Sequence, residues 1–450
     1  MTDIGGLGGP VGRIGGRIVA AWVPTHASQR PIYGMDTDVT HQVEDLCAFI
    51  DASPSPFHAV ATAATRLEAA GFVEGSPDDG AGPRYLRSSG SLVAWIAGPG
   101  RTTGFRVLMA HTDSPNLRLM PNPDRSSHGI RQLGIEVYGG ALLNSWLDRD
   151  LGCSGRLAVR NAAGMEEVLV RLDRPIARVP QLAIHLDRGV NEKGLVLDPH
   201  TSLSPVTGLG DLEHGAFLAT VAATAGVDTA DVLGFDLMLH DLAPSTLAGT
   251  GNEFVSASRI DNLLSCHVAV EAICGVVGEA GGPTPVVVLY DHEEVGSTSA
   301  TGAGSPMLSS LLGRLLGDAS LNSTDSLACS VDGAHAVHPN YPDRHDAGHL
   351  VHLGGGPVLK FNASQRYATD APGAARVRLA AERCGVPLQS YSQRADLPCG
   401  STVGPITAAV TGLTTVDLGT PQLAMHSARE LCACSDVPQL RRLLGELLRS

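Results

Sequence analysis

The chain has 450 residues, of which 43% are hydrophobic and 4% aromatic, a content sufficient for a large aliphatic core in two or three domains. Its formal net charge of −14, without a basic run, argues against nucleic-acid binding, and no apolar run approaches the roughly 20 residues of a membrane-spanning helix. The nine cysteines follow no zinc-ribbon spacing, so we expect free thiols in a reducing, cytoplasmic compartment.

The N-terminal end differs from the rest of the chain. It is rich in glycine, and its short apolar patch at residues 18–23 is smaller than the apolar core of a secretory signal. We expect residues 1–38 to form a disordered tail, or to include a start codon assigned upstream of Met35.

A first helix is predicted over residues 41–51, whose apolar side chains recur at helical spacing. Two prolines end it, and a second apolar stripe predicts another helix that stops at Gly71. Strand-like runs follow at 91–97 and 105–110, and the second of these runs leads directly to His111.

Residues 116–250 have a different pattern, in which short alternating strands are separated by turns and long helices are missing. We interpret this region as a β-rich insertion between two parts, 39–115 and 251–450, of one larger domain. The strands predicted inside the insertion are 134–138, 156–159, 167–172 and 182–186.

After residue 250 strands and helices alternate again. Apolar residues at helical spacing follow Asp261, buried strands are predicted at 285–290 and 414–418, and an amphipathic helix is predicted at 440–447. This alternation predicts an α/β fold with a mostly parallel sheet flanked by helices. In such a sheet, functional groups belong at the carboxyl ends of the strands.

Five short segments each end an apolar run in a residue that can bind a metal or transfer a proton. Together they offer two histidines and three carboxylates as ligands, with one glutamate to spare, which suits a pair of divalent cations beside a general base. Zinc suits these ligands, and manganese and cobalt accept the same nitrogen and oxygen donors. The residues are His111, Asp261, Glu293, Glu294, Asp332 and His426.

The summed charge of these residues supports a joint two-metal site more strongly than any one residue does alone. Two divalent cations bring +4, three ligand carboxylates −3 and a bridging hydroxide −1, and the neutral total suits a dry pocket. We therefore predict that Asp261 bridges the two cations. His111 and Asp332 then complete one site, and Glu294 and His426 complete the other.

The individual residues also have plainer interpretations. Asp113 follows His111 by two positions, so it either supports that imidazole from the same side of a strand or caps a turn. The adjacent side chains of Glu293 and Glu294 diverge, so one can bind a metal while the other faces a water molecule. The alternative is that this pair forms a solvated acidic turn.

Asp261 and Asp332 each precede a loop or helix, where a lone aspartate is more often an N-cap than a ligand. His426 is followed by Ser427 and Glu430, which fit a capping box, so we expect a helix to begin there. The alternative for His426 is a loop histidine.

A series of segments, from about residue 50 to the C-terminus, resembles the M18 metallopeptidases, the aspartyl aminopeptidase family. The chain departs from that pattern at its first 35 to 40 residues and at Gly333, where we expect a bulkier residue. The matching segments are AHTDSPNLR (110–118), YGG with SWLDRDLG (138–152), VPQLAIHL (179–186), SRIDNL (258–263), LYDHEEVGS (289–297), DGAHAVHPNYPDRH (332–345), GPVLKFNASQRYAT (356–369), RADLPCGSTVGP (394–405) and QLAMHSARE (422–430).

The resemblance implies a two-metal aminopeptidase that removes N-terminal residues, preferentially Asp or Glu, from peptides with a free N-terminus. It implies Glu293 as the general base and Asp113 as the support of a metal-site histidine. The ligands that it implies are His111, Asp261, Glu294, Asp332 and His426.

The resemblance also implies roles for three residues whose own patterns do not indicate them. His185 would reach the active site of a neighbouring subunit, and Lys360 and Tyr367 would line the pocket for the substrate's first side chain. Without the resemblance, we would interpret His185 as a half-buried strand histidine and Lys360 as a solvated lysine at a strand end.

At the level of assembly, the resemblance implies that the insertion, residues 116–250, is a dimerisation domain and that dimers build a closed dodecamer. The rival hypotheses are a broad-specificity aminopeptidase or deacylase on the same scaffold, and a shell-forming protein without catalysis. Neither nucleic acid nor a membrane is expected as a partner.

Overall fold

The computed structural model describes residues 37–100, 102–211, 213–279, 281–317 and 325–450, all of which belong to one compact unit. The expected tail, residues 1–38, lies outside the described residues except for its last two, which open the first helix. The nine cysteines are free thiols, as expected. No helix within the described ranges combines the length and apolar character that spanning a bilayer requires.

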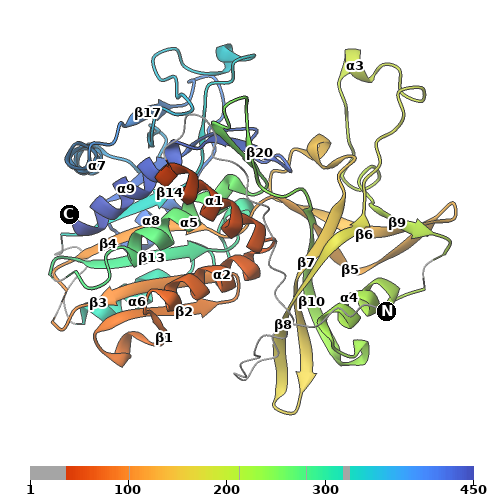
Figure 1. Cartoon of the computed structure of the whole chain (residues 1–450), viewed down its shortest axis with the longest axis horizontal. Helices are drawn as coiled ribbons and strands as arrows, with labels where there is room; N and C mark the ends of the chain where they lie inside the picture. The colour runs from red at the N-terminus through yellow and green to blue at the C-terminus, as the bar shows by residue number, and fades with distance from the viewer. Residues whose placement is uncertain (1–36, 101, 212, 280, 318–324) are drawn as a thin grey trace, which may run out of the picture. The chain divides into compact units, whose positions relative to one another are not determined.

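A nine-stranded sheet forms the centre of the α/β part of the chain (Figure 1). In spatial order its strands are β1 (Val73–Glu74), β2 (Gly82–Ser88), β3 (Ser91–Ala97), β13 (Thr284–Tyr290), β4 (Phe105–His111), β14 (Leu327–Val331), β18 (Thr415–Gly419), β16 (Val358–Phe361) and β17 (Gln389–Ser392). The four neighbouring strands β13, β4, β14 and β18 run parallel, which confirms the predicted mostly parallel core of the sheet.

Helices cover both faces of this sheet, as Figure 1 shows. Side chains alternate along β4, so Leu108 enters the core beneath one set of helices and Val107 enters the core beneath the other. One set is α1 (Thr37–Ala52), α2 (Pro56–Ala69), α5 (Ile260–Cys274), α7 (Ala371–Cys384) and α9 (Asp436–Arg449); the other is α6 (Met307–Leu316) and α8 (Val403–Thr411). The predicted helices at 41–51, after Asp261 and at 440–447, the helix that stops at Gly71, and the predicted strands at 91–97, 105–110, 285–290 and 414–418 are confirmed.

A second, six-stranded sheet is antiparallel throughout and has its own apolar core. One helix, α4 (Ala216–Ala225), packs on it, and the single turn α3 (Val190–Lys193) lies in a long connection. The β-rich insertion of the predicted fold class is therefore confirmed, whereas its boundaries and its role in dimerisation stay predictions. The strands, in spatial order, are β8 (Gly164–Ala177), β7 (Leu151–Asn161), β10 (Val232–Asp241), β5 (Asn116–Ser127), β6 (Ile130–Tyr138) and β9 (Val206–Leu209).

The strand predicted at 182–186 is wrong, because this segment forms turns between β8 and α3. Its backbone bonds are local: the amide of Leu186 donates to the carbonyl of Ala183. Alternating apolar residues make a strand only where a neighbouring strand offers partners. Here Leu182 and Leu186 are instead 61% and 75% exposed.

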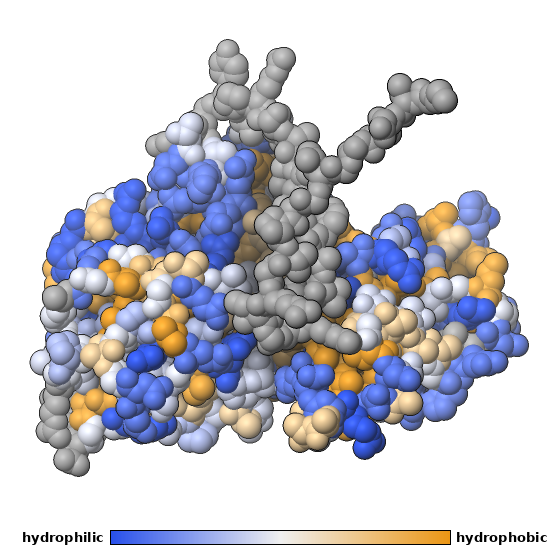
Figure 2. All heavy atoms as spheres, turned by 60° about the horizontal axis from the view of Figure 1, so that its bottom comes forward, coloured by the Kyte–Doolittle hydropathy of each residue, from blue (hydrophilic) through white to orange (hydrophobic). Residues whose placement is uncertain are grey.

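Apolar side chains also reach the surface elsewhere on this part of the molecule. Figure 2 shows apolar residues on the face of the half that contains the six-stranded sheet. Exposed large apolar residues occur on four of its strands, at Ile130, Met165, Leu169, Leu209 and Leu233. Antiparallel sheets leave one face open in this way, whereas buried parallel strands do not.

A small five-stranded sheet lies beside the amino-terminal end of α5. It corrects the helix predicted to begin at His426, because residues from Glu430 onward form a strand that pairs antiparallel with another strand. Ala257 is the partner of Glu430 in that pairing. The strands are β11 (Thr246–Ala248), β12 (Phe254–Ala257), β20 (Glu430–Ala433), β19 (Pro421–Leu423) and β15 (Ala334–His335).

Candidate metal centre

The predicted ligands converge at one edge of the nine-stranded sheet. His111 is the last residue of β4, Asp332 directly follows β14, and Glu293 and Glu294 form a turn two residues after β13. These three strands are neighbours and parallel, so their carboxyl ends meet at this edge. Asp261 enters from the start of α5 and His426 from the loop between β19 and β20.

The distances divide these groups into two overlapping sets. His111 Nε2 lies 3.3 Å from Asp261 Oδ1 and 3.5 Å from Asp332 Oδ1. His426 Nε2 lies 3.5 Å from Asp261 Oδ2 and 3.4 Å from Glu294 Oε2. Asp261 belongs to both sets and presents one oxygen to each histidine. In each set, the potential ligand atoms lie within 4.8 Å of one another.

The remaining carboxylate, Glu293, lies at the border of this arrangement. Its Oε2 is 3.9 Å from His111 Nε2, farther than the oxygens of Asp261 and Asp332. The side chain of Glu293 is 15% exposed, whereas that of Glu294 is 4% exposed. Glu293 can therefore meet a water molecule more readily than its neighbour can.

Burial and crowding perturb the protonation of these groups. Burial raises the pKa of Glu293 to about 8 and the pKa of Glu294 well above its ordinary value, and neighbouring carboxylates add to both shifts. Burial acts to lower the pKa of His111, but the carboxylates of Asp113, Asp261 and Asp332 raise it well above the ordinary value. Several carboxylates gathered in a buried space call for compensating positive charge.

Orphaned oxygens test whether metal ions fit this space. Among the described residues, Asp261 Oδ1 and Glu294 Oε1 are buried and accept no hydrogen bond. Buried polar atoms without partners are rare and require an explanation such as a bound ion. A divalent cation coordinated by these oxygens would satisfy both, so the residues fit such an ion.

The two histidines present the correct nitrogen to such ions. His111 Nδ1 lies 3.0 Å from the carbonyl oxygen of Asp113, and His426 Nδ1 lies 3.1 Å from the carbonyl oxygen of Gly140. A carbonyl oxygen can only accept, so each Nδ1 carries a proton, and each Nε2 offers a lone pair when the imidazole is in the neutral form that binds metals. Both Nε2 atoms face the carboxylates.

Asp113 is fully buried and holds the glutamate turn in place. Its carboxylate accepts the backbone N–H groups of Glu293 and Glu294, each at 3.1 Å, and the hydroxyl of Tyr138 at 2.7 Å. Its Oδ1 also lies 3.4 Å from His111 Nδ1, where the sequence predicted a supporting carboxylate. Asp113 therefore does more than cap a turn, because its carboxylate contacts His111, Tyr138 and the glutamate turn.

Glu430 is a residue of the site that the sequence analysis missed. Its Oε2 accepts the backbone N–H of Asp261 at 2.9 Å, and its Oε1 accepts the backbone N–H of His426 at 2.8 Å. The sequence analysis did not predict this role, because the capping-box interpretation assigned Glu430 to a helix that does not form. The sequence itself showed only that a glutamate follows the candidate ligand His426 by four residues; its burial and its place at the start of β20 come from the structure.

The backbone around the centre adopts conformations that side chains usually avoid. Arg259, His292, Ala424 and His426 all have a positive φ, between 56° and 67°. Each lies within two residues of, or is itself, a predicted ligand or base. Left-handed conformations of non-glycine residues occur preferentially at functional sites, where the surrounding structure holds them.

Lys360 and Tyr367 lie next to this centre. Lys360 is 1% exposed, and its Nζ donates to the carbonyl of Gly333 at 3.0 Å, lies 3.9 Å from Asp332 Oδ2 and stands 5.0 Å from the centre of the Tyr367 ring. A solvated lysine at a strand end is therefore the wrong interpretation of Lys360. His185 lies on an exposed turn and does not join the cluster of described ligand groups.

The departure at Gly333 has a packing reason. A Cβ atom at this position would lie 2.8 Å from Met425 Cε and 3.0 Å from the side-chain amide of Gln422. Side-chain atoms do not approach that closely, so a larger residue at 333 would require the ends of the Met425 and Gln422 side chains to move. Glycine leaves both side chains in place.

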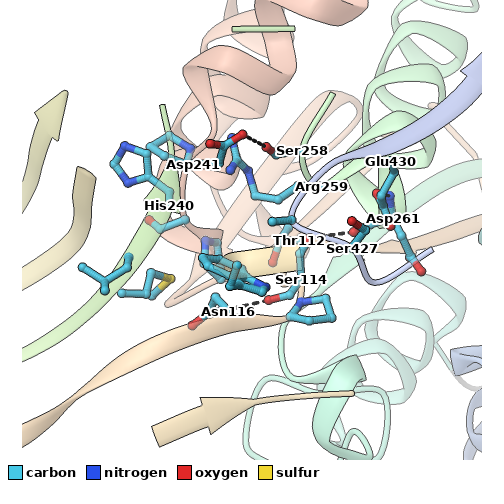
Figure 3. A pocket seen from close by; sticks show the side chains of 18 residues that line it. Thr112, Ser114, Asn116, His240, Asp241, Ser258, Arg259, Asp261, Ser427 and Glu430 are labelled. Atoms are coloured by element: carbon cyan, nitrogen blue, oxygen red, sulfur yellow. Dashed lines mark hydrogen bonds between the residues drawn. The ribbon is translucent and has the colours of Figure 1, made fainter. Parts of the chain in front are cut away.

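Beneath the centre lies a small cavity of about 20 Å³, drawn in Figure 3, with Asp261 and Glu430 next to each other on its wall. Its other walls come from the start of α5, from the six-stranded sheet and from the segment before α2. A cavity of this volume holds about one water molecule, so it is not the binding site of a peptide.

The fold and the cluster define a metal-dependent hydrolase of the α/β class, and comparisons with known proteins identify the family. The family model described as Aminopeptidase I zinc metalloprotease (M18) matches residues 49–447. The chain belongs to this family, and it is an M18 aminopeptidase and zinc metalloprotease.

Individual relatives support this assignment. The chain is 50% identical to a probable M18 family aminopeptidase 2 of Mycobacterium leprae over 409 residues, which cover 87% of this chain and 95% of the relative. It is 47% identical to the probable M18 family aminopeptidase 2 of Streptomyces avermitilis, with 87% and 94% of the two chains covered.

Solved structures share the fold. The chain matches a chain in the cryo-EM structure of the Ape4 and Nbr1 complex with a TM-score of 0.88 and 33% identity, covering 93% of this chain and 88% of that chain. It matches the mApe1 dodecamer of S. cerevesiae with a TM-score of 0.80 and 26% identity, covering 91% and 97%.

Proposed function

We propose that the cluster holds two divalent metal ions, zinc in the first instance, and that the enzyme removes N-terminal Asp or Glu residues from peptides. The observation that carries the proposal is the position of Asp261, whose Oδ1 lies 3.3 Å from His111 Nε2 and whose Oδ2 lies 3.5 Å from His426 Nε2. One carboxylate that faces two histidines through its two oxygens is suited to bridging two ions.

The ligand sets follow from these contacts. His111 and Asp332 would hold one ion with Asp261, and Glu294 and His426 would hold the other with the same aspartate. Manganese and cobalt accept the same donors, so metal analysis decides which ion is native. When bound, two such ions supply Lewis acidity that polarises a peptide carbonyl and lowers the pKa of a water molecule.

In the proposed mechanism Glu293 moves the proton. Its carboxylate accepts a proton from the attacking water and delivers this proton to the leaving amine as the peptide bond breaks. The more open position of Glu293 supports this assignment over Glu294. Asp113 keeps both glutamates oriented, because it accepts their two backbone N–H groups.

Lys360 supports the preference for an acidic first residue. Its buried ammonium stands between the Asp332 segment and the Tyr367 ring, and an ammonium with low exposure attracts a substrate carboxylate strongly. We test this with Lys360→Met, which keeps an unbranched side chain that is one atom shorter and removes the charge. The ratio of Asp- to Leu-anilide turnover should fall at unchanged zinc content, and an unchanged ratio would show that Lys360 does not select the substrate.

The assembly proposal concerns His185, which we expect to act in the active site of a neighbouring subunit and to stabilise the oxyanion there. Its exposed position on a turn supports a role outside its own subunit. We propose a dodecamer built from dimers, by analogy with the related mApe1 dodecamer of S. cerevesiae, and a cytoplasmic location, in line with nine free thiols. Sedimentation analysis tests the assembly.

One experiment tests the proposed function as a whole. The metal-free protein is reconstituted with zinc, manganese or cobalt, and the hydrolysis of Asp-, Glu- and Leu-anilides and of an N-acetylated amino acid is measured. Preferential release of Asp and Glu supports the proposal. Equal rates for all three anilides would indicate a broad-specificity aminopeptidase, and hydrolysis of only the acetylated compound would indicate a deacylase.

A further inference from the structure

Three consecutive residues from the six-stranded sheet contact the metal centre of the other sheet. They are Tyr138, the last residue of β6, and the two glycines that follow it; we call residues 138–140 the YGG segment. The nine-stranded and five-stranded sheets and their connections supply every predicted ligand. The YGG segment therefore brings a second part of the fold to the site.

The first contact of the YGG segment holds Asp113. The hydroxyl of Tyr138, a residue only 7% exposed, donates to Asp113 Oδ2 at 2.7 Å. The guanidinium of Arg118 lies 3.8 Å from the centre of the Tyr138 ring and covers it. Because Asp113 also accepts the N–H groups of Glu293 and Glu294, the phenol fixes the carboxylate on which the glutamate turn rests.

The second contact holds His426. The carbonyl of Gly140 accepts from His426 Nδ1 at 3.1 Å, and two residues later the N–H of Leu142 donates to the His426 carbonyl at 3.0 Å. His426 needs such support, because its side chain is 31% exposed and its φ is +67°, on a loop outside any helix or strand. The imidazole of His111, in contrast, is 2% exposed.

The two glycines allow this close approach. A Cβ atom at Gly139 would lie 3.0 Å from Glu294 Cβ, and one at Gly140 would lie 3.2 Å from His426 Nδ1. Gly139 also has a φ of +71°, which disfavours any side chain. The backbone of the YGG segment thus packs directly against two of the proposed ligands.

We infer that the YGG segment is a positioning clamp through which the six-stranded sheet sets the metal affinity of the centre. Tyr138 orients the glutamate turn through Asp113, and Gly140 orients the imidazole of His426. This inference rests on the proposed function, because it takes Glu294 and His426 as ligands. Removal of a group that supports a metal ligand typically weakens metal affinity by roughly 10- to 100-fold.

Tyr138→Phe is the first test, since it removes one hydroxyl and keeps the ring beneath Arg118. The matched control is Tyr85→Phe on β2, where a fully buried tyrosine donates to Glu68 at 2.5 Å outside the metal centre. Zinc is titrated into the metal-free full-length proteins in competition with a chromogenic chelator. Tyr138→Phe should bind zinc about 10- to 100-fold more weakly, and Tyr85→Phe should match the wild type.

The dependence of kcat on zinc concentration is a second measurement, and it distinguishes weaker zinc binding from a general loss of structure. At limiting zinc, Tyr138→Phe should lose kcat, and at saturating zinc kcat should return while KM for the anilide stays unchanged. The thermal midpoint of the metal-free Tyr138→Phe protein should stay near that of Tyr85→Phe. A loss of kcat that saturating zinc does not restore overturns the clamp.

Gly140→Ala tests the contact with His426 independently of Tyr138. The φ of Gly140 is not positive, so alanine is compatible with the backbone, and the new methyl group pushes against the imidazole. One of two zinc equivalents should weaken, whereas Gly98→Ala, whose Cβ would meet nothing within 4 Å, should keep both.

The outcomes separate the two proposals. Wild-type affinity for both zinc equivalents in Tyr138→Phe and in Gly140→Ala overturns the clamp and leaves the metal site intact. A Tyr85→Phe protein as weak in zinc binding as Tyr138→Phe also overturns it. A wild-type protein that binds fewer than two equivalents of every divalent metal overturns the proposed two-metal function itself.

Discussion

The two large sheets of this aminopeptidase differ in how much of their strands is buried. In the nine-stranded sheet, all seven residues of β4 are buried, and its side chains enter two apolar cores on opposite faces. In the six-stranded sheet, β8 is mostly exposed or half-buried along its length. A parallel sheet covered on both faces gives its strand ends a rigid frame, and an antiparallel sheet keeps a face available to solvent or a partner.

This difference explains where the chemistry lies. His111, Glu293, Glu294 and Asp332 stand where buried parallel strands end, because these ends are held by packing on two sides, and Asp261 and His426 reach the same place from the start of α5 and from a loop. The described residues of the six-stranded sheet and of the segment that follows β6 contribute supporting contacts to the centre, from Tyr138, Gly140 and Leu142, and none of the candidate ligands. The comparison therefore predicts large catalytic effects from one region and smaller, positional effects from the other.

The largest effect should follow from Glu293→Gln. Removal of the group that transfers the proton should lower kcat by a factor of about 10² to 10⁴, with two metal equivalents retained. The control is Asp236→Asn on β10, a carboxylate paired with Arg156 in the other sheet, which should leave kcat nearly unchanged. Elemental analysis accompanies the kinetics, and loss of metal in Glu293→Gln would exchange the roles of Glu293 and Glu294.

Leucine-to-alanine substitutions should lower the unfolding free energy by different amounts in the two sheets. Leu108→Ala on β4 removes a side chain that is 1% exposed and should cost about 2–5 kcal/mol of unfolding free energy. Leu169→Ala on β8 removes one that is 40% exposed and should cost less than about 0.5 kcal/mol. Calorimetry measures both, and an equal cost at Leu169 would mean that the β8 face is covered in solution.

Glu430→Gln should have an effect on metal binding of roughly 10- to 100-fold. Each carboxylate oxygen of Glu430 accepts one N–H, from Asp261 or from His426, and an amide can accept only one of these while its NH₂ group faces the other. Competition with a chelator measures the affinity. Glu446→Gln, at a surface pair with Arg383, is the matched control, and equal affinities for the two variants would contradict the role of Glu430.

The smallest effect concerns acid stability. Burial acts to raise the pKa of Asp45, but hydrogen bonds from His267 and Arg66 hold it well below its ordinary value. A depressed pKa stabilises the folded protein above the unfolded value near 3.9, and this stability is lost as the pH falls below it. Asp45→Asn should therefore cost about 1 kcal/mol at pH 7, since the carboxylate is partly solvent-screened, and progressively less below pH 4.

The pKa of an aspartate in the six-stranded sheet, Asp173 on β8, is lowered in the same way, which makes a direct comparison possible. Burial acts to raise the pKa of Asp173, and hydrogen bonds from His240 and Arg171 lower it to about 2. Its side chain is 40% exposed, close to the 36% of Asp45, so Asp173→Asn should show a similar loss with pH. Denaturation at pH 7 and pH 3 tests both variants, and a cost that does not shrink at pH 3 would contradict the ion-pair account.

Much of the α/β part could be predicted because its signals are local. The periodicity of apolar residues indicates α1, α2, β3, β4 and β13, since side chains repeat every 3.6 residues in a helix and every second residue in a strand. The kinds of ligand were also visible, because histidine, aspartate and glutamate at strand ends carry their chemistry wherever the chain places them.

The predictions that were wrong depended on partners distant in the chain. The pattern at 182–186 alternates like a strand, but no described strand pairs with it, so it forms turns. The capping pattern after His426 is local, but pairing of Glu430 with Ala257 makes that segment a strand. Local propensity is weak beside a complete set of backbone hydrogen bonds.

The sequence by itself determined several helices and strands of the α/β part and the chemical kinds of the candidate ligands, because both depend on neighbouring residues and on side-chain chemistry. Only the tertiary structure decided that Asp261 faces both histidines, that Glu430 holds a backbone amide 169 positions away, and that a tyrosine of the other sheet supports Asp113. The physical reason is that these contacts arise from the parallel order of β13, β4 and β14 and from the packing of two sheets, neither of which leaves a periodic trace in the chain.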